Sequence, residues 1–171
     1  MSEDKKKQWK ENCKKKWELM PDDDKRRMYE AAGEGIRRAA KEGSNLEKFF
    51  VSYLTDQGFD VIFHKQGVIT NEKLEVDIFL PSLKTVIEID GPSHFLPIWG
   101  EDKLKQVMSA DSRKSGMLLA NGYVVIRVKY LVKKLSNKRR NDLANNVLAL
   151  LKEIKQDFPS AENRFIEIEV I

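Results

Sequence analysis

Acidic residues on two neighbouring predicted strands have a spacing suited to binding a metal ion. The first strand, over residues 74–80, carries Asp77, and the second, over residues 84–90, carries Glu88 and Asp90. Side chains alternate between the two faces of a strand, so pairing as a hairpin would bring these three carboxylates together. Oxygen ligands of this kind favour Mg²⁺, for which Mn²⁺ can substitute. The alternative is a half-exposed sheet whose outer face is simply acidic.

The same alternation predicts which strand residues are in the core. Val76, Ile78 and Leu80 are expected on one face of the first strand, opposite Asp77. On the second strand, Ile87 and Ile89 share a face, and the acidic residues lie on the other. A long helix follows and must cover one face of the sheet, and acids beneath it need partners or a cation.

That helix, predicted over residues 101–120, supplies a further carboxylate. Asp111 lies within its apolar stripe, where burial of a charge is unfavourable unless the group is paired or binds metal. The alternative is an ion pair with Arg113 or Arg127. The stripe is formed by Leu104, Val107, Met108, Ser115, Leu118 and Leu119.

His94 is the candidate for proton transfer, because imidazole titrates near neutral pH. It follows the turn Gly91-Pro92-Ser93, directly after the second acidic strand. His64 belongs to an earlier predicted strand, and we expect it to be structural or to contact DNA rather than to be catalytic.

The remaining pattern predicts an α/β (α+β) fold with a central mixed sheet flanked by helices. A capping box, Ser44-x-x-Glu47, opens a helix that ends at Gly58. Further strands are expected at residues 59–64 and 123–129. An amphipathic helix runs from Leu143 to Ile154, and an edge strand is expected over 165–170.

Residues 1–43 differ from residues 44–171, which form the predicted core. They are rich in Lys and Glu and are expected to be helical, with Pro21 and three following aspartates at a helix start. Their basic clusters suggest an arm that contacts DNA phosphates, although each cluster could equally be a solvated helix face. The basic residues predicted to contact DNA here are Lys14, Lys15, Lys16, Arg37 and Arg38.

Composition excludes several classes of protein. The single cysteine, Cys13, rules out an internal disulfide and a cysteine-rich zinc site. There is no apolar run of membrane length, so we expect no membrane partner and an intracellular location. The formal charge of +4 alone does not demonstrate nucleic-acid binding.

Taken together, these motifs resemble the PD-(D/E)XK nuclease superfamily. The similarity is strongest to the branch of very-short-patch repair endonucleases and the EDxHD homing endonucleases of phages, and it covers about residues 44–155. It is carried by Val76-Asp77-Ile78, by Val86-Ile87-Glu88-Ile89-Asp90-Gly91-x-x-His94 and by Asp111-x-Arg113 with the segment up to Arg127.

The resemblance implies roles for individual residues. Asp77 matches the central metal-binding aspartate, Glu88 the acid of the signature, and the main-chain carbonyl of Ile89 a further metal ligand. Asp90 stands where the signature has lysine, so the identity of the general base is open. Within the EDxHD order, Glu47, His94 and Asp111 match the remaining positions, and the capping box explains Glu47 equally well.

The function implied is that of a Mg²⁺-dependent endonuclease acting on double-stranded DNA, of the homing type. Its location would be the cytoplasm or nucleoid, and a phage-encoded enzyme would act in its host cell. Lys65 and Arg113 are expected to contact DNA beside the site. A mismatch-directed nicking enzyme and an inactive nucleic-acid-binding protein are the alternatives. A double-strand break by a chain with one active site would need a homodimer or sequential nicks.

Overall fold

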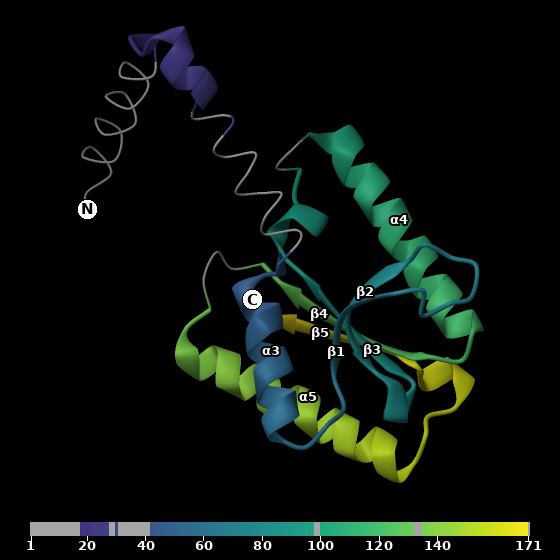
Figure 1. Ribbon diagram of the computed structural model, residues 1–171. Helices are drawn as coiled ribbons and strands as arrows, with labels where there is room; N and C mark the ends of the chain where they lie inside the picture. The colour runs from purple at the N-terminus through teal and green to yellow at the C-terminus, as the bar shows by residue number, and fades with distance from the viewer. Residues whose placement is uncertain (1–17, 28–29, 31–41, 98–99, 132–134, 171) are drawn as a thin grey trace. The chain divides into compact units, whose positions relative to one another are not determined.

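A five-stranded mixed β-sheet lies at the centre of residues 44–171 in the computed structural model of the protein (Figure 1). The strands are arranged in chain order across the sheet, with β1 at one edge and β5 at the other. Their bounds are β1 Ile62–Gln66, β2 Glu75–Leu80, β3 Thr85–Asp90, β4 Val124–Tyr130 and β5 Phe165–Val170. The predicted edge strand over 165–170 is thus confirmed.

The structure describes residues 18–27, 30, 42–97, 100–131 and 135–170. The chain divides into two units, residues 1–43 and residues 44–171, and the boundary falls where the basic N-terminal segment was expected to end. Within the first unit, residues 22–27 are helical and begin directly after Pro21, as the sequence predicts. Lys25 pairs with Asp22 and Arg27 with Asp24, both one turn apart on this helix.

Strand pairing changes direction at β3. The β1–β2 and β2–β3 pairs are antiparallel, whereas β3–β4 and β4–β5 are parallel. Parallel neighbours need a crossover connection, and two 20-residue helices supply it. Helix α4, Glu101–Ala120, links β3 to β4, and helix α5, Asn137–Gln156, links β4 to β5. The predicted mixed sheet flanked by helices is therefore what the structure shows.

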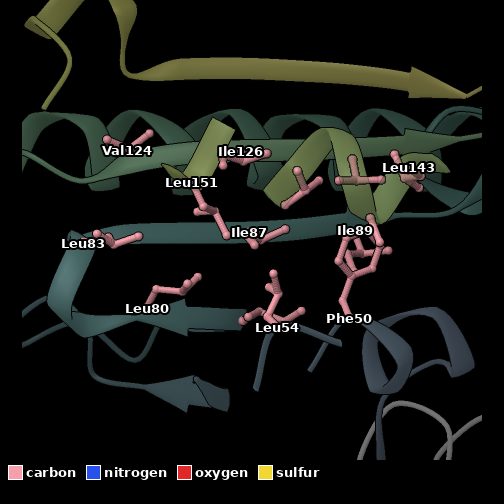
Figure 2. Close-up of a cluster of buried hydrophobic side chains, with 14 of the residues drawn as sticks. Phe50, Leu54, Leu80, Leu83, Ile87, Ile89, Val124, Ile126, Leu143 and Leu151 are labelled. Carbon is pink, nitrogen blue, oxygen red and sulfur yellow. The ribbon is translucent and has the colours of Figure 1, made fainter. Parts of the chain in front are cut away.

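Two apolar clusters hold helices against opposite faces of the sheet. The larger joins α5 and helix α3, Asn45–Asp56, to the face that bears Ile87 and Ile89 (Figure 2). The smaller joins Leu118 of α4 to the other face. All six residues of β3 are buried, because β3 lies between these two helical layers. The acidic residues of β3 are consequently enclosed beneath α4.

Local sequence signals explain most of the element bounds. Both bonds of the predicted capping box form at the start of α3, where Ser44 accepts a hydrogen bond from the Glu47 amide. Helix α4 has the bounds that the sequence predicts. The first strand was predicted too early: β1 begins at Ile62 rather than residue 59. The described part of residues 44–171 also contains three short 3-10 turns, at Pro81–Leu83, Pro92–His94 and Ala161–Asn163.

Candidate metal and proton-transfer site

Two carboxylates of β3 form the floor of the candidate site. Glu88 is 7% exposed and Asp90 is 4% exposed, and both lie on the face that α4 covers. Removing such charges from water is strongly unfavourable unless cations and hydrogen bonds compensate. The contacts that these two residues make therefore determine what the site can bind.

Asp77 lies where β2 and β3 separate. The β2–β3 pairs run from Leu80 opposite Thr85 to Ile78 opposite Ile87. At the next position the Asp77 carboxylate, through Oδ2, accepts a hydrogen bond from the Ile89 amide at 2.8 Å. The Asp77 side chain thus replaces a main-chain carbonyl as the acceptor for the Ile89 amide. This hydrogen bond holds the Asp77 carboxylate between the two strands.

The expected alternation along β2 breaks at this same residue. Val76 packs in the cluster under α4, whereas Ile78 packs in the opposite cluster, so the prediction that they share a face is wrong. The neighbouring strand has a matching irregularity, because His64 has a left-handed backbone with φ of 47°. Such a conformation is uncommon for a residue other than glycine and interrupts the regular alternation of side chains.

Asp90, His94 and Asp111 meet beside Arg127. The Nδ1 atom of His94 lies 2.9 Å from Asp111 Oδ2 and 3.4 Å from Asp90 Oδ1. Arg127 of β4 contacts Asp90 and also reaches Asp111 Oδ2, from its terminal nitrogen, at 3.0 Å. Two carboxylates therefore share one guanidinium and one imidazole, and the Asp111–Arg127 pair confirms the alternative partner considered for Asp111.

These contacts shift the pKa values of the pair formed by His94 and Asp111. The hydrogen bond to Asp111 raises the pKa of His94, against the effect of partial burial and with help from the charge of Asp90. Burial alone would raise the pKa of Asp111, but the hydrogen bond and charge of His94, with Arg127 and Lys114, lower it overall. Asp111 is therefore held ionised, and His94 is made a stronger base.

Glu88 has a different environment. Its Oε2 atom contacts the Lys114 ammonium, whereas its Oε1 atom is buried and has no hydrogen-bond partner among the described residues. Burial and the negative charge of Asp77 raise the pKa of Glu88 to about 8, although Lys114 acts in the opposite direction. Burial also raises the pKa of Asp77, against the hydrogen bond from Ile89. A further cation would favour the ionised form of both carboxyls.

Glu47 forms the predicted capping box and also contacts His64, and its place in a catalytic set stays a prediction. One of its carboxylate oxygens accepts a hydrogen bond from the Ser44 amide at 3.1 Å, and this bond completes the capping box. The other lies 2.9 Å from Nε2 of His64. The opposite ring nitrogen of His64 lies 3.1 Å from Glu75 Oε1. His64 is thus flanked by a carboxylate on each side.

Among the described residues, two groups of three side chains have ligand atoms close enough to share one metal ion. One comprises Glu47, His64 and Asp77, and the other Asp90, His94 and Asp111. In the second group the negative charge of the carboxylates is already offset, because Arg127 contacts both of them. The first group adjoins Glu88, and its described ammonium neighbour is Lys114. The three carboxyls of Glu47, Asp77 and Glu88 thus lie near a single described ammonium, that of Lys114. This group therefore fits a divalent cation better than the group of Asp90, His94 and Asp111 does.

The structure brings together most of the side chains that the sequence predicts for the site. Asp90, however, groups with His94 and Asp111 rather than with Asp77, so the expected metal set is divided. Ile89 contacts Asp77 through its amide, and a role for its carbonyl stays a prediction.

The residues predicted to contact DNA are placed only in part. Arg113 is exposed on α4, and Lys65 is half-buried on β1 beside His64. The predicted basic contacts Lys14, Lys15, Lys16, Arg37 and Arg38 lie outside the described residues.

Sequence reasoning missed Lys114 and the contacts that His64 makes with Glu47 and Glu75. Lys114 lies three residues after Asp111 and four before Leu118, so helical periodicity places all three on the inner face of α4. Met108 was assigned to that face, but it is 51% exposed. His64 had no comparable signal, because its role depends on strand pairing with β2 and on the distant Glu47.

Comparison of the chain with family models, with curated proteins and with solved structures gives no match. Among the described residues, no helix is both long and apolar enough to cross a membrane.

Proposed function

We propose that the chain is a metal-dependent DNA endonuclease with a PD-(D/E)XK-like core, of the homing type. The observation that carries this proposal is the placing of a buried carboxylate group beside a His–Asp pair. Asp77 and Glu88 lie on the buried side, and His94 pairs with Asp111 at the middle of α4. Hydrolysis of a phosphodiester needs both parts, charge neutralisation at phosphorus and a base for the attacking water.

The residues that would hold the ion are Asp77, Glu88 and Glu47. The Oε1 atom of Glu88, which has no hydrogen-bond partner within the described part of the chain, supports this assignment, because a buried oxygen without a partner is rare in a folded protein. Mg²⁺ or Mn²⁺ bound there would neutralise phosphate charge and activate water. Asp90, which stands where the signature has lysine, instead anchors Arg127.

His94 is suited to accept the proton from water. Its Nδ1 atom faces two carboxylates, which accept hydrogen bonds, so the proton of a neutral ring is held on Nδ1. Nε2 is then the basic atom. The side chain is about one-third exposed, so the ring is accessible from solvent. Asp111 orients the ring and stabilises the imidazolium that forms when the proton is taken.

A plasmid assay tests the proposal. Supercoiled DNA is incubated with the protein and Mg²⁺ or Mn²⁺, with EDTA as the control, and nicked and linear products are separated on a gel. We expect cleavage by the wild type and none by Asp77→Asn. Asp142→Asn serves as the matched control, because Asp142 is exposed on α5. Absence of metal-dependent cleavage by the folded wild type on varied DNA substrates would contradict the proposal, and a nicked product alone would favour a nicking enzyme.

Double-stranded DNA as the partner, action by a homodimer, and a cytoplasmic or nucleoid location in a phage-infected cell are parts of the same proposal. Linear product appearing without a nicked precursor would support a dimer that cuts both strands.

A further inference from the structure

We propose that His64 is a metal ligand, which Glu75 orients, and that the Glu47–His64–Asp77 group therefore prefers a first-row transition ion such as Mn²⁺ or Co²⁺ to Mg²⁺. This inference deepens the proposed function, because it names the ligand set and the metal class of the same site. The observation that supports it is that two carboxylates, those of Glu47 and Glu75, flank the imidazole of His64.

A neutral imidazole has a single N–H group and therefore satisfies a single carboxylate. His64 has one at each nitrogen, with Glu75 Oε1 at 3.1 Å from Nδ1 and Glu47 Oε2 at 2.9 Å from Nε2. When one ring nitrogen carries the proton, the other nitrogen and the carboxylate oxygen that faces it are both hydrogen-bond acceptors. A second proton or a cation is needed between that nitrogen and that oxygen.

The side on which a cation would fit is that of Glu47. Asp77 contributes a ligand atom within 4.8 Å of both the Glu47 and His64 atoms, so three donors converge there. In an octahedral ion with bonds of ~2.1 Å, neighbouring ligand atoms are about 3 Å apart, which is the spacing of Glu47 Oε2 and His64 Nε2. The buried Oε1 atom of Glu88, which has no partner among the described residues, belongs to a carboxyl close enough to Asp77 to be affected by its charge, and it is a further oxygen donor beside this group.

Glu75 then has the position of an outer-sphere partner. Histidine ligands commonly donate the other ring N–H to a carboxylate, which fixes the tautomer and increases the basicity of the ligand nitrogen. Glu75 is on β2, two residues from Asp77, and it also accepts a hydrogen bond from Gln66 at 2.7 Å. The strand that supplies one ligand thus orients another.

The nitrogen ligand determines the preference among metals. Carboxylate oxygens suit Mg²⁺ and Mn²⁺ alike, whereas imidazole nitrogen favours later transition ions over Mg²⁺. The Asp90–His94–Asp111 group has the same donor types, but Arg127 contacts both of its carboxylates and competes with an ion. The chain contains two histidines, one in each group, so single substitutions distinguish the two groups.

The test measures metal affinity by calorimetry with MnCl₂, CoCl₂ and MgCl₂, in the absence of DNA. Wild-type protein should bind Mn²⁺ and Co²⁺ more tightly than Mg²⁺. We expect His64→Ala to lower Mn²⁺ and Co²⁺ affinity by at least ~10–100-fold, the range seen even when outer-sphere partners are lost. His94→Ala is the matched control and should change these affinities less than about threefold.

Glu75→Gln keeps the proposal testable if His64→Ala is poorly folded by circular dichroism, because the Glu75 side chain is 42% exposed and the substitution keeps its size. It should lower Mn²⁺ affinity by a smaller factor than His64→Ala and leave Mg²⁺ affinity nearly unchanged. Unchanged Mn²⁺ affinity in folded His64→Ala, a larger loss in His94→Ala, or no saturable binding by the wild type would overturn the inference. Cleavage of DNA with none of these affinity changes would refute this inference alone, and His64-dependent binding without cleavage would refute only the nuclease proposal.

Discussion

Replacing Glu88 by glutamine should make the metal-free protein more stable at high pH. The substitution keeps the size of the side chain and removes its charge, which is buried beside Asp77. Burial and Asp77 raise the pKa of Glu88 to about 8, from an ordinary value of 4.5. Between these values the folded chain keeps a proton that the unfolded chain has released, so the free energy of unfolding of the wild type falls as pH rises.

The size of the effect follows from this window. Each pH unit between 4.5 and about 8 corresponds to ~1.4 kcal/mol, so the whole window amounts to about 5 kcal/mol. The proton's stabilisation is fully present below pH 4.5 and is lost above about pH 8. Glutamine stays neutral throughout, and the difference between Glu88→Gln and the wild type should therefore grow with pH by several kcal/mol.

Urea unfolding of both proteins from pH 5 to pH 9 in EDTA measures this difference. Glu153→Gln, at an exposed position of α5, is the matched control and should stay within ~0.5 kcal/mol of the wild type. Added Mn²⁺ at 100 times its Kd should stabilise the wild type by ~2.7 kcal/mol and have less effect on Glu88→Gln. Parallel pH curves for the wild type and Glu88→Gln would refute the reasoning.

Further predictions concern catalysis and DNA binding. Asp77→Ala should abolish cleavage and leave DNA affinity in a gel-shift assay intact, and turnover by the folded variant would exclude Asp77 from the site. His94→Ala should lower the single-turnover rate by roughly 10²–10⁴, and a loss below threefold would make His94 structural. Because Asp111 raises the pKa of His94, Asp111→Asn should move the rising limb of the pH–rate profile to lower pH, and a shift to higher pH would contradict the pairing. Deletion of residues 1–43 should weaken DNA binding and flatten the slope of log K against log salt, whereas an unchanged slope would show that this segment makes no phosphate contacts.

Much of the fold could be predicted from local signals. The capping box at Ser44, the uninterrupted helix over 101–120 and the alternation of Ile87 and Ile89 with acids each depend on near neighbours in the chain. Asp111 could be assigned to the site because a carboxylate in an apolar stripe needs a partner, and the structure supplies His94 and Arg127.

The errors arose where long-range pairing overrides local alternation. Val76 and Ile78 face opposite ways because β2 separates from β3 at Asp77, and nothing in the six-residue pattern indicates this. The contact between Glu47 and His64 joins residues 17 apart across a helix and a strand. Lys114 could have been found by helical spacing, but its partner Glu88 depends on how α4 lies over β3.

Different interactions hold helix α4 against the sheet along its length. Leu118, fully buried against Val86 and Val125, anchors its C-terminal end by apolar packing. Its middle is tied by ionic contacts of Asp111 and Lys114, and residues 101–108 are half-buried or exposed. Amide hydrogens of residues 101–108 should therefore exchange with solvent before those around Leu118. Because these ion pairs depend on the charge state of the site, an ion or phosphate bound there would change how far along α4 this opening reaches.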